Sequence, residues 1–277
     1  MIVNQDFANA CEQMMKKGSS SFYHAFKHLP SPRREAVYII YSFCRMIDDA
    51  VDEPEKSPYS LDELEDHFTH LDEAEGHFIW PALRFLFTHF PVTKEPFYTQ
   101  FAGQRQDYVK THYDTFDELE GYCYQVAGSV GEMLLPVLHD EPTQDVKQAG
   151  IALGKGMQIV NIIRDVGEDQ SLNRRYIPRD LLDEHGYALY DFEQQIINEE
   201  LVHVIEDLIA RADAWFEEGL TAIETYPKDS ALAIRLASAY YREIIEVVRE
   251  RDYRVFDQRA VVNSDRKANL FLQVMNS

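Results

Sequence analysis

The segment YSFCRMIDDAVD, residues 41–52, places two carboxylates on one side of an expected helix. At about 100° per residue, Tyr41, Arg45, Asp48 and Asp52 fall on one narrow stripe. Asp48 and Asp52 lie one turn apart, roughly 6 Å along the axis, and such like charges destabilise a helix by roughly 0.2–0.5 kcal/mol unless they are neutralised. Because the neighbouring residues are apolar, a divalent cation is the expected partner of these carboxylates.

The segment MQIVNIIRDVGED, residues 157–169, repeats this design. Gln158, Asn161, Asp165 and Asp169 share one helical face, and the two aspartates again stand four residues apart. Asn161 adds a neutral oxygen of the kind that magnesium accepts as a ligand. We expect the two acidic faces to oppose each other across a helical bundle and to hold two or three Mg²⁺ ions, with ligand positions left for water or phosphate.

The alternative for each segment is a solvated acidic face, which is the usual meaning of a single DxxxD pattern. Two such patterns, each embedded in apolar sequence and each with an arginine in the same turns (Arg45 and Arg164), favour a metal–diphosphate site instead.

The net charge of the chain is a second reason to expect cations at the site. The chain carries 48 acidic and 27 basic residues, a formal charge of −21. Such a surface repels nucleic acid and anionic lipid, so nucleic acid is not an expected partner. It also repels a diphosphate, and cations must therefore be concentrated at the site of an anionic substrate.

Helical periodicity dominates the whole chain, which we expect to form a single all-α domain over residues 1–277, with two packed helical halves as the alternative. Ser31 is the expected N-cap of the helix that carries the first acidic segment, Ser60 and Glu63 form a capping-box pattern, and Pro136 should kink its helix. The expected helices cover residues 32–51, a segment from 60 onward, 77–90, 94–112, 115–139, 143–170, 193–226, 229–252 and a short stretch near the C-terminus.

The cellular setting follows from three further features. The cysteines (Cys11, Cys44 and Cys123) are few and widely spaced, which is typical of a reducing compartment. The N-terminus lacks the pattern of a secretory signal, and no apolar stretch approaches the roughly 20 residues of a membrane span. We therefore expect a cytoplasmic protein, with peripheral membrane contact left open.

Five segments, in order along the chain, resemble signatures of the squalene and phytoene synthase family, and the bacterial dehydrosqualene (4,4'-diapophytoene) synthases most of all. The two acidic motifs are RMIDDAVD (45–52) and NIIRDVGED (161–169). The other three are SSSFYHAF (19–26), GYCYQVAGSVGE (121–132) and RYIP (175–178). The resemblance covers nearly the whole chain.

The resemblance implies an isoprenoid-synthase bundle of helices around a central cavity and a prenyltransferase of carotenoid biosynthesis. One prenyl diphosphate ionises and alkylates a second, which gives presqualene diphosphate when the substrate is farnesyl diphosphate. This intermediate ionises, rearranges to a 1-1' linkage and loses a proton. The implied magnesium ligands are Asp48, Asp52, Asn161, Asp165 and Asp169.

The family also implies roles for residues outside the metal site. Ser19, Ser21, Arg45, Arg164, Tyr241 and Arg259 would bind diphosphate. Tyr41, Tyr122 and Gln158 would lie near the reacting carbons or the released diphosphate. Phe22, Phe26, Val126, Ala127, Gly131, Leu134 and Leu138 would line the prenyl cavity, although close helix packing is an equal alternative for the small residues among them.

The expected product is dehydrosqualene from two farnesyl diphosphates, with a downstream desaturase as a candidate partner. Phytoene from two geranylgeranyl diphosphates is the alternative. No nicotinamide motif is recognisable, since Gly154-Lys-Gly156 lacks a third glycine and a preceding strand, so NADPH is not expected. A non-catalytic helical scaffold is disfavoured because all the acidic ligands are present, and a head-to-tail elongase is disfavoured because the spacing is DxxxD rather than DDxxD.

Overall fold

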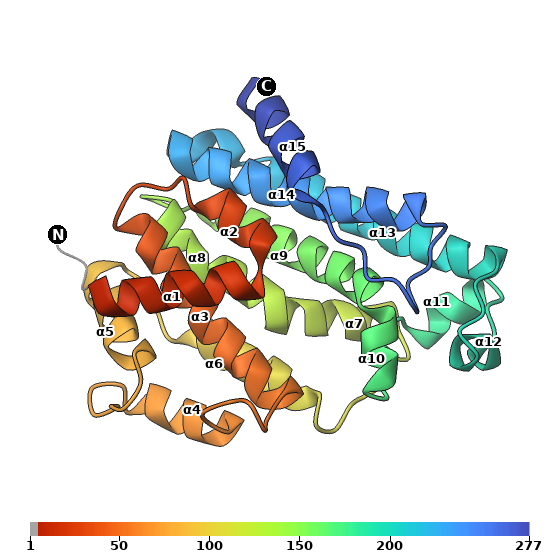
Figure 1. Ribbon diagram of the computed structural model, residues 1–277, viewed down its shortest axis with the longest axis horizontal. Coiled ribbons are helices and arrows are strands. Elements are labelled where there is room, and N and C mark those ends of the chain that lie inside the picture. Colours follow the sequence, from red (N-terminus) through yellow and green to blue (C-terminus); the bar gives the residue numbers. More distant parts are fainter. Residues whose placement is uncertain (1–4, 277) are drawn as a thin grey trace.

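The computed structural model describes residues 5–276, and over that range the chain folds into a single α-helical domain without a β-strand (Figure 1). This confirms the all-α prediction. The helices are α1 (Gln5–Gly18), α2 (Ser20–Phe26), α3 (Arg33–Asp52), α4 (Leu61–Thr69), α5 (Ile79–His89), α6 (Glu95–Gln106), α7 (Phe116–Cys123), a π-helix (Tyr124–Gly128), α8 (Ser129–Leu138), α9 (Gln144–Arg164), α10 (Val166–Ser171), α11 (Arg179–Glu184), α12 (Leu189–Glu193), α13 (Glu199–Leu220), a 3₁₀ turn (Ile223–Thr225), α14 (Lys228–Glu250) and α15 (Ser264–Asn276).

The two helices that carry the acidic motifs lie inside the bundle. α3 is covered by α1, α5 and α8, and α9 is covered by α8, α13 and α14. Ile39, Phe43 and Ile47 recur every four residues on α3 and are fully buried. Each such side chain contributes about 1.5–3 kcal/mol by leaving water. The apolar faces of these helices therefore fix where their acidic faces point.

Several helix limits agree with the sequence, and one expected cap does not. The predicted helix 32–51 is α3, and Ser60 and Glu63 form the predicted capping box at the start of α4. Ser31 is not an N-cap: Pro32 occupies that position and makes no side-chain capping bond. The prediction for Ser31 was therefore wrong.

The helix predicted over residues 94–112 ends early because its last part pairs with another segment. α6 stops at Gln106, and the following loop joins the chain that leads into α11. The backbone N–H of Arg175 donates to the carbonyl of Thr111 at 2.8 Å, and that of Arg179 donates to the carbonyl of Tyr113 at 3.0 Å. Hydrogen bonds to a distant segment replace those of the helix.

Two other expected helices are interrupted. The stretch 115–139 departs from α-helical geometry at the π-helix Tyr124–Gly128 and not at Pro136, which lies within α8. The stretch 143–170 breaks at Asp165 into α9 and α10, although the N–H of Asp169 still donates to the carbonyl of Asp165 at 2.9 Å. The prediction for residues 193–226 was too long, since α13 covers only Glu199–Leu220.

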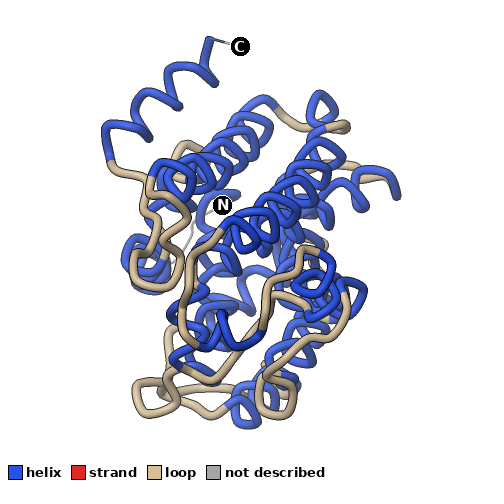
Figure 2. The backbone as a smooth tube through the Cα atoms, turned by 90° about the vertical axis from the view of Figure 1, so that its right-hand side faces the viewer, coloured by secondary structure: helices blue, strands red, loops and turns tan. Residues whose placement is uncertain are grey.

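α15 stands at the edge of the bundle (Figures 1 and 2). The segment 251–263 that leads to it (the α14–α15 connector) reaches α10, where the Gly167 N–H donates to the Val255 carbonyl (Figure 1). Within the described part of the chain, none of the helices combines the length and the apolar character needed to span a bilayer.

Candidate active site

The first acidic motif lies at the carboxyl end of α3. Arg45 pairs with Asp48 at 3.3 Å and with Asp49 at 2.5 Å. From α6, the side-chain amide of Gln104 donates to Asp48 Oδ1 at 3.2 Å, and Gln104 is itself buried. Asp48 is thus held between a guanidinium of its own helix and an amide of the neighbouring helix.

Asp48 is enclosed by protein and yet reached by solvent. Its side chain is 35% exposed, but burial, followed by repulsion from Asp52, raises the pKa of its carboxyl to about 7. Arg45 and Gln104 oppose this rise without cancelling it. Such a carboxylate binds a cation readily, because the cation removes the cost of its charge.

The second motif spans the break between α9 and α10. Arg164 donates to both oxygens of Asp165, one of them at 2.7 Å. Arg259, carried by the α14–α15 connector, pairs with Asp165 at 3.1 Å and with Glu168 at 3.1 Å. Residues almost 100 positions apart thus meet at one carboxylate.

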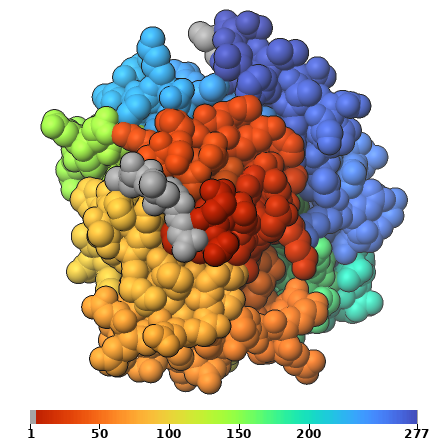
Figure 3. Space-filling view, turned by 60° about the vertical axis from the view of Figure 1, so that its left-hand side comes forward, coloured from red at the N-terminus to blue at the C-terminus, as the bar shows by residue number. Residues whose placement is uncertain are grey.

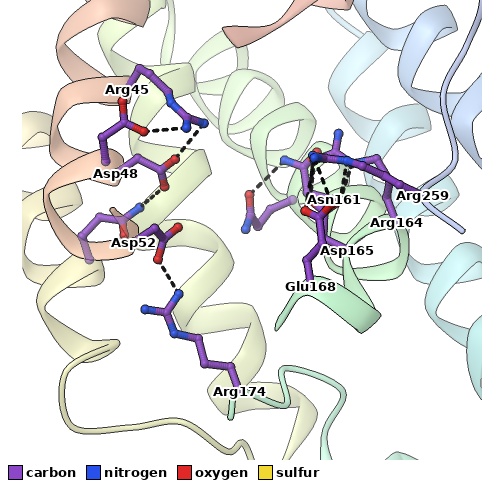
Figure 4. A network of polar contacts seen from close by, with 12 residues as sticks. Arg45, Asp48, Asp52, Asn161, Arg164, Asp165, Glu168, Arg174 and Arg259 are labelled. Atoms are coloured by element: carbon purple, nitrogen blue, oxygen red, sulfur yellow. Dashed lines mark hydrogen bonds and ion pairs between the residues drawn. The ribbon is translucent and has the colours of Figure 1, made fainter. Parts of the chain in front are cut away.

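The two motifs face each other, as Figure 4 shows for Asp48 and Asp52 on one side and Asn161 and Asp165 on the other. The pKa of Asp169 is raised to about 8 by burial and then by the charges of Asp165, Asp52 and Asp107, while Arg174 lowers it. Arg174 also pairs with Asp52. The predicted opposition of the acidic faces is therefore present in the structure.

A buried cluster of phenols adjoins the acidic residues. Asp107 accepts hydrogen bonds from Tyr122 at 2.9 Å and from Tyr176 at 3.0 Å, and the Tyr122 and Tyr176 rings stack at 5.0 Å. Burial raises the pKa of Asp107 to about 6, although Arg174 and the two phenols oppose the rise. Tyr122 was predicted as a site residue, and the structure joins it to the motifs through Asp107 and Arg174.

The donor set suits magnesium that is shared with a phosphate. Within residues 5–276, no three histidine, cysteine, aspartate or glutamate side chains converge as ligands of one ion. Magnesium, however, usually takes only one or two carboxylates and completes its shell with water and substrate phosphates. Among the described residues, Asn161 Oδ1 is buried and has no hydrogen-bond partner, and an unpaired buried oxygen of this kind is costly unless a ligand or water pairs with it.

A cluster of aromatic rings from α2, α3 and α14 lies beside the acidic motifs. Phe22 lies 5.5 Å from Phe26, 6.2 Å from Tyr41 and 5.6 Å from Tyr241, measured between ring centroids. Burial raises the pKa of Tyr241, which adjoins Asn161 and Arg164. These rings bring the amino-terminal helices together with both acidic motifs.

The remaining predicted residues are placed as follows. Gln158 accepts from the Asn161 amide at 3.3 Å. Ser19 is the N-cap of α2, accepting from the N–H of Phe22 at 3.3 Å, and Ser21 is half-buried in the first turn. Leu134 is half-buried, whereas Val126 and Leu138 are buried.

Close helix packing explains the small residues better than a cavity wall does. A Cβ added to Gly131 would lie 2.3 Å from the Gly150 carbonyl oxygen, and one added to Gly154 would lie 2.2 Å from that of Ala127. The π-helix and α8 therefore touch α9 backbone to backbone. The structure favours this alternative for Gly131 and Ala127.

The sequence did not single out four residues that the structure brings to the site. They are Gln104, Asp107, Arg174 and Tyr176. None of them belongs to the two acidic segments. Only Tyr176 could have been found from the sequence, because it lies in the RYIP segment that resembles a family signature.

Comparisons with known proteins agree with this geometry. A family model described as squalene/phytoene synthase matches residues 15–266. A phytoene synthase of Arthrospira platensis is 34% identical over 282 residues, covering 95% of this chain and 90% of its own length. The chloroplastic phytoene synthase 2 of Oryza sativa subsp. japonica is 34% identical over 271 residues, covering 95% of this chain and 68% of its own.

A solved structure is also similar over nearly its full length. A crystal structure of a dehydrosqualene synthase in complex with a ligand superposes with a TM-score of 0.91. It is 34% identical in sequence, and the match covers 98% of this chain and 96% of that one.

Proposed function

The chain belongs to the squalene/phytoene synthase family, whose enzymes are prenyltransferases, and on this premise we propose that it joins two farnesyl diphosphates head to head to give dehydrosqualene. The observation that carries the proposal is the opposition of the two acidic motifs. Burial with carboxylates of both segments, Asp165 and Asp52, raises the pKa of Asp169 to about 8, and burial and Asp52 raise that of Asp48 to about 7. An arrangement that costs free energy without a cation supports a site built for one.

Asp48, Asp52, Asp165, Asp169 and Asn161 would hold magnesium. When bound, the metal supplies positive charge that stabilises a departing diphosphate. Asp52 is paired with Arg174, and Asp165 with Arg164. Those arginines lie within reach of the phosphate oxygens that would come with the metal, and they can exchange a carboxylate for a phosphate without leaving the site.

The reaction breaks the C1–O bond of the first farnesyl diphosphate, and the diphosphate leaves with the bonding electrons. The allylic cation adds to the double bond of the second molecule, and loss of a proton gives the cyclopropylcarbinyl diphosphate. A second ionisation, a rearrangement and another proton loss yield the triene. Arg45, Arg164 and Arg259 are positioned at the carboxylates where the released diphosphate would lie.

Aromatic faces support the cationic steps. The rings of Tyr113, Tyr122 and Tyr176 form one cluster, with centroids 5.0–5.7 Å apart. A cation near the face of such a ring gains roughly 0.5–2 kcal/mol. Asp107 fixes two of the hydroxyl groups, so the rings keep their orientation as the charge moves.

Phytoene synthesis from geranylgeranyl diphosphate is the second candidate. The similar solved structure is titled a dehydrosqualene synthase, whereas the two curated relatives are phytoene synthases at the same 34% identity. The similarity therefore supports the reaction type equally for both chain lengths. We favour the shorter substrate on the sequence motifs.

Incubation of the purified protein with each diphosphate separates the two candidates. Farnesyl and geranylgeranyl diphosphate would be supplied singly and as a mixture with magnesium, and the products resolved by mass. We expect dehydrosqualene from the first and little product from the second, with no squalene when NADPH is added. A preference for geranylgeranyl diphosphate would overturn the choice of substrate, and no coupled product from either would overturn the reaction.

A further inference from the structure

Lys267 is a buried lysine with no acidic partner among residues 5–276. It lies on α15, is 5% exposed, and donates a hydrogen bond to the hydroxyl of Ser20. Burial alone lowers its pKa, and no carboxylate in the described part of the chain offsets the effect. An ammonium group without a counter-charge is costly inside a protein.

The isolation of Lys267 is unusual for this chain, which has almost twice as many acidic as basic residues. The preceding residue, Arg266, pairs with both Glu243 and Glu250. Arg266 thus has acidic partners, whereas within the described part of the chain the Lys267 ammonium group has only the Ser20 hydroxyl. The position of Lys267 is suited to an anion that is not part of the protein.

The ammonium group lies next to the segment predicted to hold diphosphate. Ser20 stands between Ser19 and Ser21 at the start of α2 and is exposed, and its hydroxyl accepts the hydrogen bond of the Lys267 ammonium group. Figure 3 shows the C-terminal segment lying against the N-terminal one on this face.

The residue that precedes these serines, Gly18, contacts the helix that carries the first acidic motif. A Cβ on Gly18 would lie 2.4 Å from the Tyr41 hydroxyl. Phe22 of α2 also lies 6.2 Å from Tyr41 between ring centroids. The start of α2 therefore lies beside Tyr41, one turn before Arg45 on α3.

We propose that Lys267 binds a diphosphate oxygen of substrate at the serines that open α2, a role that rests on the proposed function. Its ammonium group donates a hydrogen bond to the Ser20 hydroxyl. With a diphosphate present, the same group gains the counter-charge that the protein does not supply.

Calorimetric titration with inorganic pyrophosphate and magnesium tests this role. Lys267→Met removes the charge at similar length, and Lys267→Gln retains a donor for Ser20. We expect both variants to bind pyrophosphate about 10-fold more weakly, as for a lost hydrogen bond to a charged group. Arg266→Met, which removes the same charge from a surface ion pair, should bind within about 2-fold of the wild type.

Melting temperature distinguishes binding from attachment of α15. We expect the ligand-free Lys267→Met protein to melt at the wild-type temperature or above it, because an unpaired buried charge is removed. Wild-type pyrophosphate affinity in both Lys267 variants would overturn the role, and a lowered melting temperature would then assign Lys267 to holding α15 on α2. A wild-type protein that neither binds pyrophosphate nor reacts with either prenyl diphosphate would instead overturn the proposed function.

Discussion

Asp48 is the residue on which the account can be tested most simply. Its carboxylate faces the second motif and is raised in pKa by burial and by Asp52. Asp48→Asn keeps the shape and removes the charge, so we expect turnover to fall by about 100-fold or more. Helicity and melting temperature should be unchanged or slightly higher, because a crowded like charge is lost.

The matched control for this variant is Asp66→Asn, which alters an exposed carboxylate on α4. It should leave both turnover and melting temperature unchanged. Steady-state rates with farnesyl diphosphate and magnesium would compare the two variants. Normal turnover in Asp48→Asn would show that the first motif has no role in the reaction.

The raised pKa values of Asp48 and Asp169 also predict how stability varies with pH. Folding raises them from 3.8 to about 7 and about 8, so the native state binds protons that the unfolded state has released. In the metal-free protein the free energy of unfolding should therefore fall as pH rises from about 4 to about 8. Asp107, raised to about 6, acts in the same direction.

Thermal melts with a chelator between pH 5.5 and 8.5 would measure this dependence. Asp169→Asn should flatten it, since one of the titrating groups is removed. A melting temperature that rises with pH over this range would show that these carboxylates are not buried together.

At the scale of elements, the contact between α10 and the α14–α15 connector carries Arg259 to the second motif. Gly167 N–H donates to the Val255 carbonyl at 3.1 Å, and a Cβ on Gly167 would lie 1.9 Å from the Phe256 carbonyl oxygen. Gly167→Ala must push the connector away, which costs at least about 1–3 kcal/mol. We expect lower turnover as well as lower stability, because Arg259 moves with the connector.

Gly121→Ala is the control for this change. Gly121 lies in α7 with nothing within 4 Å of an added Cβ, so the variant should be more stable by about 0.5–1 kcal/mol and fully active. Denaturant unfolding and initial rates of both variants would test the comparison. Equal stability and activity in the two would contradict the role of the connector.

Helical periodicity predicted the elements that bear the motifs, because a face repeated every three to four residues is a local property. It placed α3 and the spacing of Asp165 and Asp169 correctly. It could not predict the end of α6 at Gln106, which depends on hydrogen bonds between residues 111–114 and 175–180. Asp107 and Arg174 were missed for the same reason, since only the tertiary fold brings them to Tyr122 and Asp52.

At the scale of the whole molecule, the aromatic wall beside the motifs should set the length of the substrate. Phe26 is buried and packs against Phe22. If it lines the prenyl cavity, Phe26→Ala deepens the cavity and should shift the product from dehydrosqualene toward phytoene in mixed incubations. The loss of the ring should also cost about 3–5 kcal/mol of stability.

Phe97→Ala controls for the loss of stability. Phe97 is fully buried in a separate ring cluster with Phe43 and Phe68, so its truncation should destabilise the fold similarly without changing the ratio of products. An identical product ratio in the two variants would remove Phe26 from the cavity wall.

The central claim is that two acid-bearing helices hold a metal–diphosphate complex between them. Anomalous diffraction from crystals grown with Mn²⁺ and a thio analogue of farnesyl diphosphate measures this directly. The predicted result is manganese density between Asp48 and Asp52 on one side and Asn161 and Asp169 on the other, with the diphosphate oxygens bridging the ions. Density confined to other surfaces, with these four side chains free of metal, would contradict the claim.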